Sequence, residues 1–286
     1  MPPNEKERPL IVVVGAGSKH GTKNSDLPDS VRWGLGGALA IPFAEKGYDV
    51  VLMARREEVL DDVRKAVEAV QQANNYAAAK VLCVKCDVTD EESVEQAFEY
   101  VKSSEHFGAD SSTYIDLVMF NVAPPYPSNF KFEGWGKVIL PHQIDFDDMN
   151  MQYDTQVNGL IRICKQVMPG MIDRKRGCIL LSGESCCNLH GGFEFGSVAP
   201  ARAALRSLGQ SMFQAYGPMG IHVCNINIGG IIDSPKTRSW TEREELTKPN
   251  EIAEQFLNIY KQKSTVWSYE VSLSPGFSAH KVNMSM

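Results

Sequence analysis

Short aliphatic runs alternate with longer amphipathic segments along most of this 286-residue chain. The runs predict strands over residues 10–14, 50–53, 81–86, 115–119, 178–181, 221–226 and 267–273. The amphipathic segments predict helices over residues 34–46, 57–73, 90–101, 149–171, 198–216 and 251–260, and the Pro-rich stretch 124–141 reads as a long loop. Strands that alternate with helices form a parallel sheet covered on both faces. We therefore expect a Rossmann-type α/β fold with a doubly wound parallel sheet in three α/β/α layers, and no linker divides residues 1–286 into two domains.

Composition and charge exclude several classes of protein. The formal net charge of −6 argues against a nucleic-acid binder, which needs a basic face. No apolar run approaches the roughly 18 residues of a membrane span, and the polar N-terminus MPPNEKERPL is unlike a signal peptide. Cys83 and Cys86 have CxxC spacing, but no second pair completes a zinc set, so we expect no metal site. The chain is expected to be soluble and intracellular, in the cytoplasm or in an organelle.

Glycine and polar residues follow the expected strands where such sheets bind ligands. Ligands of doubly wound sheets lie beyond the carboxyl ends of the strands. Residues at or just past those ends include Gly15, Arg55, Asp87, Asn121, Ser182 and Gly230. The sequence therefore predicts that the ligand site is built from these positions.

A glycine-rich turn follows the first strand, in the run VVVGAGS, and the next helix starts at GLGGALA. Gly15, Gly34 and Gly36 fill the three glycine positions of a nucleotide-binding turn if residues 19–33 are looped out, and Gly17 and Leu35 lie beside them. The helix start would offer N–H groups to phosphate. We expect segment 19–33 to form a flap over the cofactor; the alternatives are that it displaces the phosphate, or that the glycines serve packing alone.

The end of the second strand selects the cofactor. An acidic residue there would bind the ribose hydroxyl of NAD, but this chain has Arg55 and Arg56. A guanidinium suits the 2′-phosphate of NADP(H), and Lys19 could add a second positive charge. The alternative is a solvated basic pair at a helix start.

These motifs resemble those of the short-chain dehydrogenase/reductase family over nearly the whole chain. VVVGAGS with GLG resembles the family's glycine turn, CDVTD resembles the segment near the adenine, and FNVAP stands where the family has NNAG. QVNGLIRICKQVMPGM, GCILLSGES and IGGIIDS resemble three further family segments. The resemblance implies the fold and an NADP(H) site. The positions it implies as cofactor contacts in these segments are Asp87, Val88, Asn121, Gly230 and Ser234.

The resemblance also implies where the catalytic groups belong, and two of them are replaced. VAPARAALRSLGQSM corresponds to the family's YSASKAALRSL, which puts Val198 at the catalytic Tyr and Arg202 at the catalytic Lys. Valine has no proton to give, whereas arginine could still bind the nicotinamide ribose. Either Ser182 or Ser185 stands for the carbonyl-polarising Ser, and Asn158 for the structural and proton-relay Asn.

Two functions remain open on the sequence. The first is an NADP(H)-dependent oxidoreductase of a carbonyl or alcohol with a degenerate active site, in which His190 is a candidate substitute acid or else an exposed loop histidine. The second is a non-catalytic cofactor-binding or structural protein. The small-molecule substrate stays unnamed. The family usually pairs through the helices expected over residues 149–171 and 198–216, so the resemblance implies a homo-oligomer, and a non-catalytic chain would have a protein partner instead.

Overall fold

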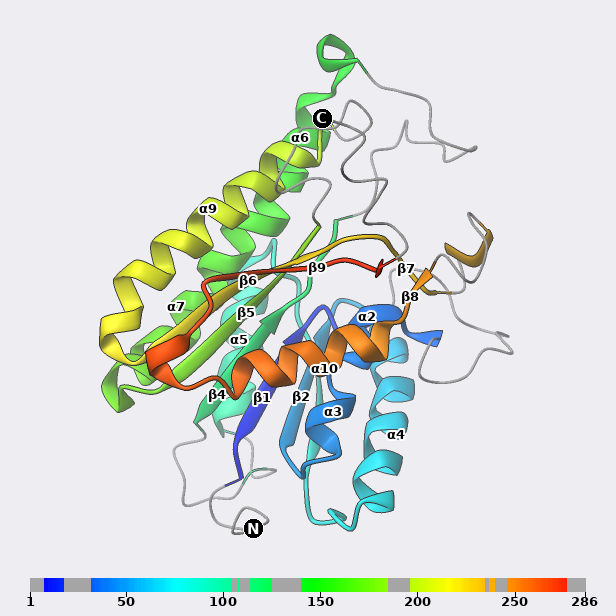
Figure 1. Ribbon diagram of the computed structural model, residues 1–286, viewed down its shortest axis with the longest axis vertical. Coiled ribbons are helices and arrows are strands. Elements are labelled where there is room, and N and C mark those ends of the chain that lie inside the picture. Colours follow the sequence, from blue (N-terminus) through cyan, green and yellow to red (C-terminus); the bar gives the residue numbers. More distant parts are fainter. Residues whose placement is uncertain are drawn as a thin grey trace.

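A seven-stranded parallel sheet forms the centre of the molecule (Figure 1). The computed structural model describes residues 8–17, 32–103, 107, 114–124, 140–184, 196–234, 237–239 and 246–276. The strands are β1 (Leu10–Val14), β2 (Asp49–Ala54), β3 (Val81–Lys85), β4 (Ile115–Phe120), β5 (Gly177–Glu184), β6 (Ile221–Ile228) and β9 (Glu270–Leu273). Their order is β3-β2-β1-β4-β5-β6-β9, and every neighbouring pair is parallel. The predicted doubly wound Rossmann-type fold is confirmed, and the strand order reverses between β1 and β4, where such sheets bind ligands.

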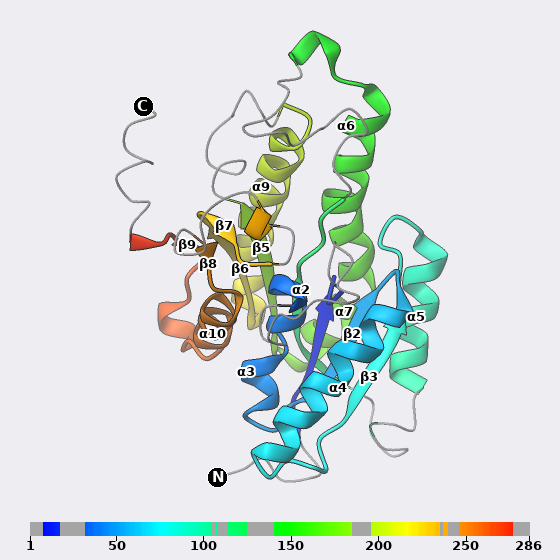
Figure 2. The ribbon, with the colours of Figure 1, turned by 90° about the vertical axis from the view of Figure 1, so that its right-hand side faces the viewer.

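Helices cover both faces of this sheet (Figures 1 and 2). One layer contains α5 (Glu91–Ser103), α7 (Gly159–Arg174) and α9 (Ala199–Tyr216). The opposite layer contains α2 (Gly34–Ala38), α3 (Ile41–Ala44), α4 (Glu57–Ala73) and α10 (Pro249–Tyr260). None of the helices in the described ranges is long and apolar enough to cross a membrane.

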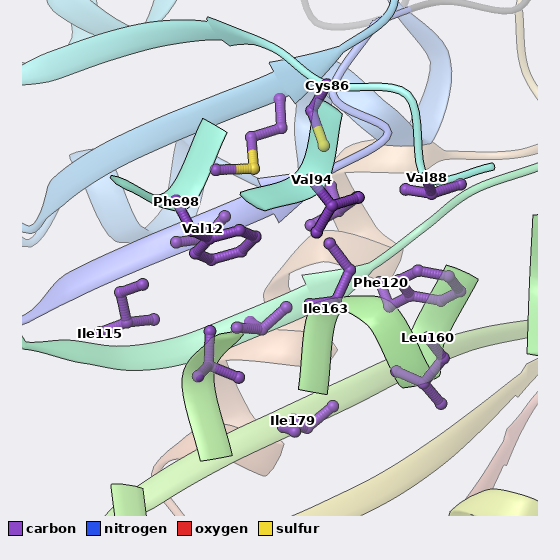
Figure 3. Close-up of a cluster of buried hydrophobic side chains, with 14 of the residues drawn as sticks. Val12, Cys86, Val88, Val94, Phe98, Ile115, Phe120, Leu160, Ile163 and Ile179 are labelled. Atoms are coloured by element: carbon purple, nitrogen blue, oxygen red, sulfur yellow. The ribbon is translucent and has the colours of Figure 1, made fainter. Parts of the chain in front are cut away.

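Each layer seals its own hydrophobic core against the sheet. The side chain of Val12 in β1 belongs to the core under α5 and α7, whereas Ile11 and Val13 belong to the core under α2, α3 and α4. In Figure 3, Val12 lies among residues of that first core, including Phe98 of α5 and Ile163 of α7. Because successive side chains of a strand point to opposite faces, a strand buried on both faces is apolar throughout. This is why β1 could be read from an unbroken aliphatic run.

Two of the expected helices are interrupted. The one expected over residues 34–46 breaks between α2 and α3, and Pro42 lies in the first turn of α3. Proline has no backbone N–H to continue the helix of α2. The one expected over residues 149–171 contains a π-helical turn, Asp154–Asn158, between α6 (Phe146–Tyr153) and α7. A π turn adds a residue to the helical repeat and so changes which side chains face the core.

Candidate functional site

The glycine turn after β1 lies directly against its two neighbouring strands. The amides of Gly15 and Ala16 both donate to the carbonyl of Met53, at 2.8 and 3.0 Å. Gly15 has φ +87°, and a Cβ there would collide with the carbonyl oxygen of Asn121. The side chain of Asn121 returns a hydrogen bond to the Gly15 carbonyl at 3.3 Å. Only glycine fits at position 15, so this predicted site residue has a physical reason for its identity.

Close packing continues from the turn into the helix that follows. A Cβ on Gly36 would collide with the Gly15 carbonyl oxygen, and one on Gly17 would lie 3.4 Å from the Cβ of Ala54 at the end of β2. Gly34 has φ +59°. Leu35 is buried in the core, so its side chain points away from the open edge of the sheet. The three glycines Gly15, Gly17 and Gly36 fit a dinucleotide, because they let backbone rather than side chain approach a pyrophosphate.

The last residue of the expected insertion belongs to the helix that follows it. Trp33 is the N-terminal flanking residue of α2; its ring is buried, and a Cβ on Gly37 would collide with the Cβ of Trp33. The loop expected over residues 19–33 therefore ends before Trp33, because burial of a large aromatic side chain stabilises the helix start. Lys19 lies outside the described residues.

Arg55 and Arg56 are exposed just beyond the carboxyl end of β2. Arg55 has no hydrogen bond or ion pair with any residue in the described part of the chain. At the end of β3, the carboxylate of Asp87 accepts hydrogen bonds from the amide and hydroxyl of Thr89, at 3.0 and 2.7 Å. Val88 is buried beneath α7, where a Cβ on Gly159 would lie 3.1 Å from it. Of these predicted contacts, the arginines and Asp87 lie at the ligand edge, and the Val88 side chain lies in the core.

Arg202 joins three elements at the carboxyl edge of the sheet. Its side chain reaches from α9 and is only 5% exposed. Its guanidinium donates to the carbonyl of Ser182 at 3.1 Å, to the carbonyl of Val122 at 3.5 Å, and to a carboxylate oxygen of Glu184 at 3.3 Å. Its Nε is buried without a hydrogen-bond partner. Val198 precedes Arg202 by one turn, at the start of α9, and its side chain has no polar atom.

Two polar side chains of the interior and of the sheet edge, Gln156 and Glu184, were not among the predicted site residues. Glu184 ends β5, and its side chain is 45% exposed. Gln156, in the π turn, is fully buried; its amide donates to Gln152 at 3.0 Å, and its Oε1 has no partner. Two features of the sequence could have pointed to them. Glu184 is an acidic residue at the end of a strand, and Gln152 and Gln156 are polar residues four positions apart on a helix face that packs inward.

Ser182 and Asn158 make contacts that the sequence did not predict. Ser182 meets Arg202 through its carbonyl. Asn158 is exposed, and its amide donates at 3.0 Å to Asp154, which also pairs with Arg162. The π turn buries Gln156 and leaves Asn158 exposed, and the structural and proton-relay role that the resemblance implies for Asn158 stays a prediction. Ser185 and His190 lie outside the described residues.

The segment after β6 is held by hydrogen bonds among its own residues. Gly230 has φ +91°, and β7 (Ile231–Ile232) pairs with β8 (Leu246–Thr247). The hydroxyl of Ser234 is buried and bonds the hydroxyl of Thr237 at 2.9 Å, so that it caps a short helical turn. Ser234 is therefore hydrogen-bonded within its own segment, and its Cβ lies 3.9 Å from the place that a Cβ on Gly34 would take.

A buried carboxylate holds the same segment to the body of the protein. Asp233 is fully buried and accepts from Arg238 at 2.6 and 2.9 Å and from Lys248 at 3.0 Å. Burial acts to raise the pKa of Asp233, but the hydrogen bonds from Arg238 and Lys248 outweigh it and leave the pKa lowered. The carboxylate is therefore ionised and fixes both ends of the 233–248 segment. Among the described residues, no group of His, Cys, Asp and Glu is placed to hold a metal ion.

Comparisons with known proteins agree with this geometry. The family model for the short chain dehydrogenases matches residues 31–245. An uncharacterized oxidoreductase of Staphylococcus aureus (strain MRSA252) is 24% identical over 272 residues, which cover 93% of this chain and 96% of that protein. L-sorbose reductase from Gluconobacter frateurii, solved with NADPH and L-sorbose, aligns with a TM-score of 0.71 at 19% identity, over 94% of this chain and 96% of that one. A short chain oxidoreductase from Pseudomonas aeruginosa PAO1, solved with NADPH and described as having an atypical catalytic center, aligns with a TM-score of 0.72 at 19% identity, over 95% of this chain and 97% of that one.

Proposed function

The chain belongs to the short-chain dehydrogenase family, and on that premise we propose that it is an NADP(H)-dependent oxidoreductase of a carbonyl or alcohol group. The nicotinamide cofactor, when bound, supplies or accepts the hydride. Gly15, Gly17 and Gly36 would hold its pyrophosphate against the backbone, and Asp87 would lie near the adenine. Two relatives in fold were solved with NADPH, which supports this choice of cofactor.

The observation that carries the proposal is the state of Arg55. Its side chain is exposed beside the glycine turn, since Gly17 packs against Ala54, the residue before it. No described residue neutralises its charge. A guanidinium without a carboxylate partner fits a 2′-phosphate, and offers no acceptor for the ribose hydroxyl that NAD carries there.

The test is the ratio of the dissociation constants for NADPH and NADH, measured by nicotinamide fluorescence. Loss of one charged hydrogen bond is expected to cost about 1.5–3 kcal/mol, so Arg55→Gln should weaken NADPH binding by about 10- to 100-fold and leave NADH binding nearly unchanged. Arg55→Asp should reverse the preference. Arg64→Gln is the matched control, because Arg64 has the same charge but is already paired with Asp61 and Glu68 on α4. Equal affinity of the parent protein for the two cofactors would contradict the proposal.

The replaced catalytic positions support an unusual proton route. Val198 carries no ionisable group, and Arg202 is buried with its donors directed at Ser182, Val122 and Glu184. These contacts position the carboxyl end of β5 and the segment after β4. The same feature favours the second candidate, a cofactor-binding protein without turnover. NADPH binding with no oxidation or reduction of any substrate would identify that case.

A further inference from the structure

The carboxylate of Glu184 is an ionisable group that contacts Arg202, one of the two replaced catalytic positions. It stands at the last residue of β5, at the edge where the proposed cofactor would bind. At the strand ends, Ile228 of β6 lies opposite Glu184, the segment after β4 contains Asn121 and Val122, and α9 follows Val198 and carries Arg202. Arg202 forms an ion pair with Glu184 at 3.3 Å.

The two members of the pair formed by Glu184 and Arg202 differ in exposure. The Arg202 side chain is 5% exposed and that of Glu184 is 45% exposed. The arginine is anchored by two main-chain carbonyls, of Ser182 and Val122, and the carboxylate is the more exposed partner. Such a carboxylate is held in position and is still accessible to a small molecule at the edge of the sheet.

An accessible carboxylate selects its ligand by hydrogen-bond chemistry. An ionised carboxylate only accepts hydrogen bonds. An alcohol hydroxyl has a proton to donate to it, whereas a carbonyl has none. The Glu184 carboxylate thus favours an alcohol over a carbonyl compound as the group bound next to it.

We propose that Glu184, positioned by Arg202, is the catalytic base of an alcohol oxidation. This inference rests on the proposed function. The Glu184 carboxylate takes the hydroxyl proton of the alcohol as the O–H bond breaks, and the C–O bond becomes C=O. The hydride from the same carbon passes to oxidised NADP, which is thereby reduced, so that the products are the carbonyl compound, NADPH and a protonated Glu184. In the reverse direction the protonated carboxyl is the acid.

The turnover test follows NADP⁺ reduction with 2-butanol, cyclohexanol and sorbitol as probes, across the acidic to mildly alkaline pH range. Loss of a general base costs about 10²- to 10⁴-fold, so Glu184→Gln should lower kcat/KM for the alcohol by that factor and leave NADPH binding unchanged. Glu184→Asp should retain more activity than Glu184→Gln. Glu184→Ala should regain activity when formate is added, because formate can supply the missing carboxylate. A merely structural carboxylate would show no formate rescue.

Glu270→Gln is the matched control. It removes another glutamate that pairs with an α9 arginine, Arg206, away from this edge, and turnover should stay close to that of the parent. A readout without turnover uses trifluoroethanol with NADP⁺: infrared difference spectra should show a protonated carboxyl band that Glu184→Gln lacks.

Three results would overturn the inference. Glu184→Gln with parental kcat/KM would show that another group takes the proton, and collapse in His190→Asn alone would identify that group as His190. A parent that binds NADPH and oxidises none of the probes at any pH would reject the base and leave the cofactor site standing. A parent that binds no NADPH would reject the proposed function and this inference together.

Discussion

Two arginines one helical turn apart on α9 pair with two glutamates of the sheet, and the pairs are built differently. Arg206 donates two hydrogen bonds to the carboxylate of Glu270 in β9, at 2.5 and 2.9 Å. Arg202 donates a hydrogen bond to Glu184 of β5 at 3.3 Å. In the first pair the carboxylate is the more buried partner, with 17% exposure against 31% for the arginine; in the second pair the arginine is the more buried, with 5% against 45%.

This reversal separates a structural ion pair from one that serves a site. Both oxygens of Glu270 are occupied by Arg206, so this pair joins α9 to the edge strand and leaves little for a ligand. Arg202 uses its remaining donors on main-chain carbonyls of β5 and of the segment after β4, which leaves the Glu184 carboxylate outermost. The distance and the direction of burial, rather than the residue types, distinguish the two pairs.

The largest expected effect on stability comes from truncating the two arginines. Arg202→Met removes a buried guanidinium and leaves two main-chain acceptors without their donor, so the free energy of unfolding should fall by about 2–3 kcal/mol. Arg206→Met removes a partly exposed pair and should cost about 1 kcal/mol. Urea unfolding of both variants at neutral pH measures the difference. A larger loss of stability in Arg206→Met than in Arg202→Met would show that burial of the arginine does not determine how much each pair stabilises the protein.

Substitution of the two glutamates should lower the free energy of unfolding in the opposite order, with the larger loss at Glu270. Glu270→Gln loses a two-point contact with Arg206 and weakens a 3.4 Å bond from Gln210, so we expect a loss of about 1–2 kcal/mol. Glu184→Gln alters the 3.3 Å contact of a partly exposed side chain with Arg202 and should cost about 0–1 kcal/mol. Thermal unfolding of both variants checks the ranking. Combined with the turnover assay, the variant that loses more stability should lose less activity, and a parallel loss of both would remove the distinction between the pairs.

The smallest effect is expected at the other end of α9, where Phe213 lies edge-on to His222 with ring centroids 6.5 Å apart. His222 stacks on Trp267 at 4.9 Å, and its Nε2 bonds the carbonyl of Ser268 at 2.8 Å. Burial lowers the pKa of His222, and the bond to Ser268 only partly offsets this.

The sign of the resulting pH dependence follows from proton binding. The unfolded chain binds a proton at His222 near pH 6.5 and the folded chain binds it only at lower pH. The stability of the parent should therefore fall as the pH drops below about 6.5 and level off below the folded pKa. His222→Phe should flatten that decline without changing alcohol turnover, which urea midpoints over this pH window would measure. An equally steep decline in His222→Phe would assign the titration to another group.

Local patterns were sufficient for most of the architecture. The bounds predicted for β1 (Leu10–Val14) and α4 (Glu57–Ala73) agree with the structure, because an unbroken apolar run and a clear amphipathic repeat each depend on near neighbours. The parallel order followed from the alternation of strands and helices, and the family from motifs along the chain. Gly15 was identified for the same reason, since a tight turn after a strand requires a residue that tolerates positive φ.

The tertiary structure decided the parts of the site that depend on distant neighbours. Pairing with β6 extends β5 past its apolar run, with Gly183 opposite Asn227 and Glu184 opposite Ile228, and this carries Glu184 to the edge. The π turn buries Gln156 and exposes Asn158, a rotation that no regular helical period predicts. Sequence alone determined which backbone elements this protein forms, because those depend on local periodicity. Which side chains meet at the carboxyl edge was decided only by strand register and helix winding, because these contacts join residues far apart in the chain.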